Sequence, residues 1–248
     1  MSKQSTPSDK SLKILKVVDP PNQKIKPLHQ NLPQPPSLVL MIMPTKTGKS
    51  TIISNMLLNK AFYGQDYFDY VKIISTTINN DQTSRFLKKA FDTEDHYDDK
   101  MIYDLVKSQS QYEKQNMPSV CLVCDDCLGE KTTALNNLAS RYRHYNIDLF
   151  IVSSQLLKKV NTTIRANANW VLVGRLTNEA EVEKLSEEWS GMFGGDKNFR
   201  EQYKKATKKR YDFMTLKLTE NPSEIWINFN EKIYPPENMK IYPPCYLF

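Results

Sequence analysis

One segment near the amino-terminal end constrains the fold more than any other: an apolar run that stops abruptly at a polar, glycine-containing loop. The run is Leu-Val-Leu-Met-Ile at residues 38–42, and the loop continues as Met-Pro-Thr-Lys-Thr-Gly-Lys-Ser to residue 50. A continuous apolar run of this length is typical of a strand buried on both faces of a parallel sheet. A strand that ends sharply before a helix directs backbone N–H groups and the positive helix end at one anion. The sequence therefore predicts a phosphate-binding loop, with a helix from Lys49 to about Lys60.

Two residues of this loop have side-chain tasks. Lys49 would reach the β- and γ-phosphates of ATP, and the Ser50 hydroxyl would complete the coordination of a Mg²⁺ ion that bridges them. The residue types match G-x-x-x-x-G-K-S/T except at Met43, which takes the place of the first glycine. Met43 must therefore adopt an allowed backbone conformation with its side chain directed away from the nucleotide. The predicted nucleotide-binding residues are Met43, Pro44, Thr45, Lys46, Thr47, Gly48, Lys49, Ser50 and Thr51.

A second apolar run, residues 120–124, ends in two adjacent carboxylates, Asp125 and Asp126. Buried strands seldom end in two like charges unless a cation lies close by, because an unpaired buried carboxylate is costly. We expect the Asp125 carboxylate to accept a hydrogen bond from a water molecule bound to Mg²⁺. Asp126, pointing to the other side, would polarise the water that attacks the γ-phosphate. A solvated Asp-Asp turn is the alternative interpretation.

A third polar strand end reads Ser-Ser-Gln at residues 153–155. In a parallel sheet this position would place Gln155 beside the attacking water and the γ-phosphate, so Gln155 is the candidate sensor of the nucleotide. Polar residues end many strands, and the interpretation therefore depends on the two neighbouring motifs.

Strand-like and helix-compatible stretches alternate through the rest of the chain. Strands are expected near 70–75, 120–124, 149–152 and 170–173, and helices near 82–91, 103–114, 132–142 and 178–189. Alternation of this kind predicts an α/β fold of the P-loop NTPase type, with a mostly parallel sheet sandwiched between helices. Residues 213–218 and 225–229 favour a C-terminal β-hairpin across the Asn221-Pro222 turn.

The two ends of the chain differ in composition from the middle. Residues 1–35 carry six lysines against two aspartates and are rich in proline, which indicates a flexible basic arm. Residues 231–248 contain the repeat Ile-Tyr-Pro-Pro twice and form a Tyr/Pro-rich tail, either folded over its own domain or docked on a partner. One ATPase domain is expected between them, from 36 to 230. No apolar run approaches the length of a membrane span or a signal-peptide core, so an intracellular location is expected.

Three further clusters invite functional interpretations. Residues 197–210 hold seven lysines and arginines against one glutamate, and so form a candidate contact for polyanions or simply a solubilising helix. Cys121 and Cys124 would point to opposite faces of a strand, so the C-x-x-C-x-x-C run does not predict a zinc site. The acidic run at 92–99 around His96 is expected to be a solvated loop.

Four stretches, in this order and spacing, carry a resemblance to a known family. They read P-T-K-T-G-K-S-T, V-C-L-V-C-D-D, R-Y-R-H-Y-N-I-D-L-F-I-V-S-S-Q and T-I-R-A-N-A-N-W-V-L-V. Over about residues 36–175 the chain resembles the viral genome-packaging ATPases of the FtsK–HerA superfamily, of the type found in poxvirus-like large DNA viruses and virophages. The resemblance implies a motor that hydrolyses ATP, with Mg²⁺, to move double-stranded DNA of any sequence into a preformed capsid.

The same resemblance implies a homo-oligomeric ring, commonly of six subunits, that acts at a cytoplasmic viral assembly site beside a capsid or portal-vertex protein and could remain with the virion. An arginine of one subunit would complete the nucleotide site of its neighbour, which maps onto Arg143 and Arg165 here. Each arginine could instead form a surface ion pair. Asp126 stands where many members of the superfamily carry glutamate, so the base would be one methylene shorter.

Other functions share these residues. A DNA helicase or a conjugative-type DNA pump of the same superfamily would use the same ATPase site. From a different class, the chain could be a structural protein that binds ATP without hydrolysing it. A nucleotide kinase is disfavoured, because no acceptor-site lid rich in arginine is evident.

Overall fold

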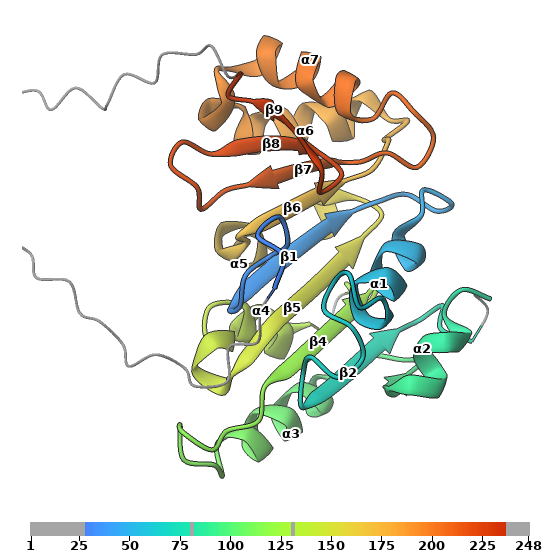
Figure 1. Ribbon diagram of the computed structural model, residues 1–248, viewed down its shortest axis with the longest axis vertical. Helices are drawn as coiled ribbons and strands as arrows, with labels where there is room; N and C mark the ends of the chain where they lie inside the picture. Colours follow the sequence, from blue (N-terminus) through green and yellow to red (C-terminus); the bar gives the residue numbers. More distant parts are fainter. Residues whose placement is uncertain (1–27, 80–81, 130–131, 237–248) are drawn as a thin grey trace, which may run out of the picture.

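The computed structural model describes residues 28–79, 82–129 and 132–236 of the 248-residue chain. In this part of the chain, nine strands form one sheet in the order β3-β2-β4-β5-β1-β6-β7-β8-β9 (Figure 1). The pairs from β3 to β6 are parallel, and those from β6 to β9 are antiparallel. The predicted α/β class with a mostly parallel sheet is therefore confirmed. The strands are β1 (Ser37–Ile42), β2 (Tyr70–Ser75), β3 (Asp92–Glu94), β4 (Val120–Asp125), β5 (Ile147–Ser154), β6 (Trp170–Val173), β7 (Met214–Lys217), β8 (Glu224–Ile227) and β9 (Glu231–Tyr234).

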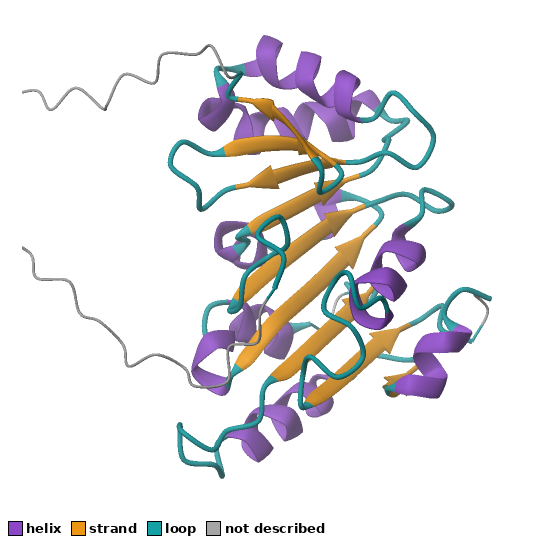
Figure 2. Ribbon diagram, viewed as in Figure 1, coloured by secondary structure: helices purple, strands orange, loops and turns teal. Residues whose placement is uncertain are grey.

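Helices connect most of the parallel strands (Figure 2). Several begin at a side-chain cap, because Asp98, Asn161 and Asn178 each accept a hydrogen bond from the backbone N–H two residues later. The Asp98 cap starts its helix four residues before the expected position. The α-helices are α1 (Lys49–Leu58), α2 (Arg85–Ala90), α3 (Asp99–Gln109), α4 (Thr133–Ala139), α5 (Thr162–Asn167), α6 (Glu179–Trp189) and α7 (Asp196–Ala206), and short 3-10 turns lie at Tyr142–Tyr145, Leu157–Lys159 and Ser190–Phe193.

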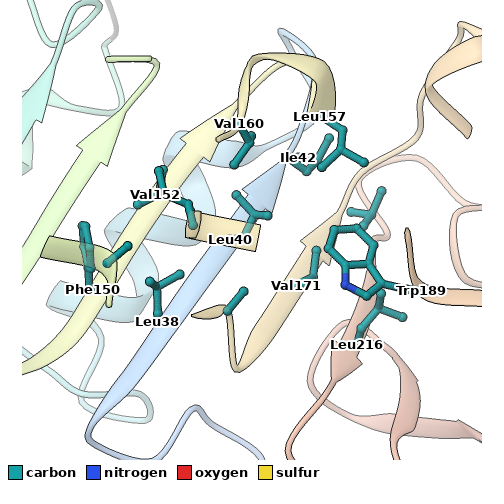
Figure 3. Close-up of a cluster of buried hydrophobic side chains, with 14 of the residues drawn as sticks. Leu38, Leu40, Ile42, Phe150, Val152, Leu157, Val160, Val171, Trp189 and Leu216 are labelled. Atoms are coloured by element: carbon teal, nitrogen blue, oxygen red, sulfur yellow. The ribbon is translucent and has the colours of Figure 1, made fainter. Parts of the chain in front are cut away.

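The sheet separates two hydrophobic clusters, because alternate residues of each buried strand face opposite sides. On β1, Leu38, Leu40 and Ile42 join the cluster that is covered by α3 to α7 (Figure 3). Val39 and Met41 join the second cluster, which includes the buried face of α1. Burial on both faces explains why β1 reads as an unbroken apolar run, and it holds the loop that follows on a rigid strand.

The sheet extends beyond the predicted elements at both edges. The expected C-terminal hairpin is present as β7 and β8, and β9 pairs with β8 as a further antiparallel strand. Residues 231–234 were expected in an irregular tail, but they are held because Tyr234 packs edge-on against Phe193 at 5.7 Å. At the other edge, β3 is formed by residues that were expected in an acidic loop. The Nζ atom of Lys72 on β2 lies 2.8 Å from Asp92 Oδ2 and 3.0 Å from Glu94 Oε1, and so offsets their charges.

The packed part of the chain begins before residue 36. Leu32 is buried in the second cluster, and the Tyr63 hydroxyl donates to the Pro33 carbonyl oxygen at 2.5 Å. Residues 1–27 of the expected arm, residues 241–244 of the Tyr-Pro-Pro repeat and Cys245 lie outside the described residues. Within the described segments, no helix combines the length and the apolar character that crossing a membrane requires.

Candidate nucleotide site

Three of the predicted motifs meet at the carboxyl edge of the parallel strands. β5 lies between β4 and β1 in the sheet, and the in-register pairs are Asp125 with Ser153 and Ile42 with Ser154. The loop after β1, the carboxylate pair at the end of β4 and Gln155 after β5 therefore emerge side by side. This edge is where ligands bind in open α/β sheets.

The loop after β1 is a tight turn that leads directly into α1. The Thr47 hydroxyl donates to the Pro44 carbonyl oxygen at 2.6 Å, and Gly48 lies in the left-handed region with φ of 99°. Ile52 donates the first backbone hydrogen bond of the helix, to the carbonyl of Gly48 at 3.0 Å. The N–H groups of the preceding helical residues have no acceptor within the helix, and they form the positive helix end that suits a phosphate.

Met43 adopts the conformation that its replacement of glycine requires. Its backbone lies outside the left-handed region, and its side chain is fully buried in the cluster behind β1. Space for it is provided by Gly174, directly after β6. A Cβ on Gly174 would lie 3.3 Å from Met43 Cγ and 3.3 Å from Thr47 Oγ1. The absence of a side chain at Gly174, at the end of the neighbouring strand, therefore lets Met43 and Thr47 pack closely there. The Met43 side chain points into the core, away from the predicted nucleotide site, as expected.

Lys49 lies among oxygen atoms of the strand ends. Its Nζ is 3.0 Å from Oδ1 of Asp125 and forms a second ion pair with Asp126. Asp125 is only 5% exposed and accepts further hydrogen bonds from Ser75 Oγ at 2.8 Å and from Ser153 Oγ. The alternative of a solvated Asp-Asp turn is therefore wrong for Asp125, which is a buried and fully partnered carboxylate.

Asp126 differs from the expectation that it would point away from Asp125. Its φ of 52° places it in the left-handed region directly after β4, where the strand alternation has ended. Its N–H donates to the Ser153 carbonyl at 3.2 Å, and its carboxylate turns towards Lys49. Gln155 Nε2 donates to Asp126 Oδ2 at 3.3 Å. The side chains of Lys49, Asp126 and Gln155 are therefore connected to one another.

Two pockets lie beside the cluster of Lys49, Asp126 and Gln155. A pocket of about 160 Å³ is lined by Asp126, Gln155, Thr76, Thr77, Leu128, Ser154 and Lys159. Ser50, Ser75 and Asp125 line a smaller one beside α1. Hydroxyl and carboxylate oxygens are the donors that Mg²⁺ prefers, and Mg²⁺ is commonly held by one or two carboxylates together with substrate phosphates. The side chains of Ser50 and Asp125 thus fit the predicted metal role.

The cysteine run has the predicted geometry. Cys121 faces one hydrophobic cluster, and Cys124 faces the other with Cys127. Burial raises the pKa of all three thiols, that of Cys127 to about 12. Among the described residues, no group of three or more His, Cys, Asp or Glu side chains could hold a metal ion.

Neither candidate arginine reaches the Lys49 cluster within the same chain. Arg143 is exposed in the 3-10 turn before β5, so the length of that strand, about 23 Å, separates it from the carboxyl edge. Arg165 on α5 pairs with Glu188 of α6, and Arg165 also donates to Thr162 Oγ1 at 3.2 Å. The ion-pair alternative therefore describes Arg165 in this structure. The role of either arginine in a neighbouring subunit stays a prediction.

Three residues at this edge were not identified from the sequence: Ser75, Gly174 and Tyr211. Ser153 belongs to the polar strand end that the sequence indicated, but its hydrogen bond to Asp125 was not predicted. Ser75, Asp125 and Ser153 are in register on three neighbouring strands, so a search for polar residues at parallel strand ends would have found Ser75 as well. Gly174 follows a strand directly, a position that often marks a close approach. Tyr211 lies 3.6 Å from the position of a Cβ on Gly48, and no local pattern points to that contact.

Comparisons with known proteins support the predicted resemblance. No protein-family model matches the chain. The chain is 25% identical over 190 residues to Uncharacterized protein 075L of Invertebrate iridescent virus 6, across 70% of this chain and 71% of the viral protein. Its fold is similar to that of B204, the DNA-packaging ATPase of Sulfolobus Turreted Icosahedral Virus, with a TM-score of 0.57, 18% identity, and coverage of 78% of this chain and 97% of B204.

A second solved structure has a similar fold. The pCW3 conjugation coupling protein TcpA matches with a TM-score of 0.50 and 14% identity, over 73% of this chain and 57% of TcpA. The chain thus shares its fold with B204 and TcpA, and the resemblance stated from the sequence motifs is confirmed at the level of the fold.

Proposed function

We propose that this protein is a motor that hydrolyses ATP to move double-stranded DNA into a viral capsid. The observation that carries the proposal is the convergence of Lys49, Asp126 and Gln155 at one edge of the sheet, beside a glycine-containing loop that opens α1. A phosphate-binding loop, a carboxylate base and a polar sensor are the protein groups that phosphoryl transfer to water requires. The folds of B204 and TcpA support the same class of enzyme.

Each side chain of the cluster has a task in this reaction. The loop from Met43 to Thr51 would bind the phosphates through its backbone and the start of α1, and Lys49 would leave its carboxylate partners to contact phosphate oxygens. Ser50 and Asp125 would hold Mg²⁺, which neutralises phosphate charge when it is bound. Asp126 would orient and deprotonate the attacking water, and Gln155 would position the same water. The buried hydrogen bonds of Asp125 would keep this residue in place during the reaction.

DNA would contact the exposed side of α7 and the turn after it. The buried face of α7 is formed by Phe199, Tyr203 and Ala206, which leaves the basic residues on the outside. Arg200 is occupied by Asp196 and Glu179, so it is not counted among the free cations. The exposed lysines are Lys197, Lys204, Lys205, Lys208 and Lys209, and Arg210 is exposed beside them with its guanidinium over the Tyr211 ring. Lysines that contact phosphates hold DNA of any sequence, and binding would weaken steeply as the salt concentration rises.

A ring of identical subunits, commonly six, belongs to this proposal because, among the residues that the structure describes, no arginine pairs with the Lys49 cluster. Arg143 and Arg165 are the candidates for a group supplied by the neighbouring subunit, which would stabilise charge in the transition state. Residues 36–230 would form the ATPase domain, and the flanking segments would remain for contacts with DNA or with a capsid or portal-vertex protein. The motor would act where virus particles assemble inside the cell.

The test is the rate of phosphate release with and without double-stranded DNA, in the wild-type protein and in Asp126→Asn. We expect DNA to stimulate the wild-type rate, and the substitution to lower turnover by a factor of about 10² or more while ATP binding persists. Asp104→Asn, at an exposed position of α3, is the matched control and should have the wild-type rate. Full turnover in Asp126→Asn would refute the role of the base.

Two other functions predict different results. The likeness to TcpA favours a DNA pump for conjugation as the second candidate, and such a pump would share the ATPase site. A helicase would separate DNA strands by itself, so robust unwinding by the isolated protein would count against packaging. A structural ATP-binding protein would bind ATP but release no phosphate in any of these assays.

A further inference from the structure

Tyr211 lies against the phosphate-binding loop although it is far from that loop in the sequence. Its Cδ1 atom is 3.6 Å from the position that a Cβ on Gly48 would occupy. The side chain of Tyr211 is nevertheless 55% exposed. A large aromatic ring therefore stands open to solvent at the rim of the loop that would hold the phosphates.

The backbone around Tyr211 is held in an unusual conformation. Tyr211 has φ of 70°, a region that bulky residues rarely occupy. Asn228 stabilises the next two residues, because its side chain accepts from Phe213 N at 3.0 Å and donates to Asp212 Oδ1 at 2.9 Å. Backbone strain that the surrounding structure maintains is a frequent feature of ligand sites. The hydrogen bonds of Asn228, directly after β8, thus fix the backbone that follows Tyr211.

The order of the strands places Tyr211 at the end of the site where the base of a nucleotide would lie. Asp126 and Gln155, which would face the γ-phosphate, follow β4 and β5 on one side of β1. Tyr211 precedes β7, two strands away from β1 on the other side. Two strand spacings amount to about 10 Å. A nucleotide with its γ-phosphate at Asp126 and its β-phosphate at the loop would therefore direct its base towards Tyr211.

We propose that Tyr211 is the platform on which the base of the bound nucleotide stacks. The inference rests on the proposed nucleotide binding at residues 43–51 and adds the contact that holds the other end of the ligand. The guanidinium of Arg210 lies over the Tyr211 ring, 4.8 Å from its centre, and contacts it through a cation–π interaction. Stacking on an aromatic face tolerates any base, since every base has a π-face. The site accordingly accepts both ATP and GTP.

The experiment compares binding of ATP and of inorganic tripolyphosphate by calorimetry in the full chain. Tyr211→Asn removes the ring and suits the positive φ, whereas Tyr211→Phe keeps the ring. We expect Tyr211→Asn to bind ATP about tenfold more weakly and tripolyphosphate as well as the wild type does. Tyr211→Phe should bind both ligands like the wild type. Tyr112→Asn, at another exposed tyrosine, is the control for a general surface effect.

The outcomes separate this inference from the proposed function. Unchanged ATP affinity in Tyr211→Asn would overturn the stacking role while the phosphate site stands. Equal losses for ATP and tripolyphosphate would also overturn it, because the ring would then act through the shape of the loop. Weakened binding of double-stranded DNA with normal ATP binding would assign Tyr211 to DNA instead. A wild-type protein that binds neither phosphate ligand would refute the nucleotide site itself, and this inference with it.

Discussion

Met43 Cγ lies 3.3 Å from the position that a Cβ on Gly174 would take, so the side chain of one residue occupies the space that the other leaves free. Met43 stands at the position where the phosphate-loop pattern has its first glycine, and Gly174 follows the neighbouring strand β6. The two residues must therefore be considered together. A side chain at either position is accommodated only when the other is small.

Gly174→Ala should disturb the phosphate-binding loop from the side. The added methyl group would press on Met43 Cγ and on Thr47 Oγ1, both at 3.3 Å, and overpacking of this kind costs about 1–3 kcal/mol. We expect a lower melting temperature and weaker ATP binding. Met43→Ala in the same chain should restore part of the ATP affinity, although Thr47 still limits the space. Gly191→Ala, where a Cβ would meet nothing within 4 Å, is the control.

Lys49→Met should reduce stability as well as nucleotide binding. The substitution leaves Asp125 as a buried carboxylate without its cation, a change that costs about 3 kcal/mol. Adding Asp125→Asn should recover most of the free energy of unfolding, since an amide can still bond with Ser75 and Ser153. Urea unfolding measures both effects. If Lys49→Met is as stable as the wild type, the ion pair contributes nothing to the fold. Neither variant should bind tripolyphosphate.

Mixing two inactive variants should reveal which arginine acts on a neighbouring subunit. A ring built from Lys49→Ala and Arg143→Ala subunits contains some interfaces with an intact loop and an intact arginine, and these should hydrolyse ATP. Arg165→Ala in place of Arg143→Ala tests the other candidate. Recovery of activity on mixing identifies the arginine. Glu188→Gln removes the ion-pair partner of Arg165. A changed rate of ATP hydrolysis in this variant would show that the ion pair keeps Arg165 from reaching a neighbouring site. An arginine whose removal leaves the rate unchanged has no such role.

Asp148→Asn should stabilise the protein at neutral pH. Burial raises the pKa of Asp148, and the nearby charge of Asp69 raises it further, while the hydrogen bond from Ser119 Oγ at 2.6 Å opposes the shift. A raised pKa means that the folded state binds the proton more tightly than the unfolded state, so the ionised form weakens the fold. Above the pKa of Asp148 in the folded state, the ionised carboxylate lowers the free energy of unfolding by its full amount. As the pH falls, protonation of the carboxylate removes this loss.

The advantage of Asp148→Asn in melting temperature should therefore be largest near pH 7 and shrink as the pH is lowered and Asp148 takes up its proton. The difference between the two proteins isolates this residue, because the other carboxylates titrate in both. A constant difference across this range would contradict the assignment.

The strands and the phosphate-binding loop follow from the sequence because the signals for them are local. The apolar runs that became β1 and β4 are buried on both faces, and the pattern from Gly48 to Ser50 requires only the start of one helix. Asp125, Asp126 and Gln155 were identified from the sequence for the same reason. Each lies at the end of an apolar strand or directly after it, and parallel strands end at the same edge.

Only the tertiary structure decided how these side chains meet. Asp126 turns back towards Lys49 through a left-handed backbone, Gly174 accommodates Met43, and Tyr211 comes to the loop from the start of β7. Such contacts join residues that are distant in the chain, and they depend on strand order and packing, which no local pattern encodes. The sequence by itself determined which strands form and which polar residues are expected at their ends. The order of strands in the sheet decided which of them touch.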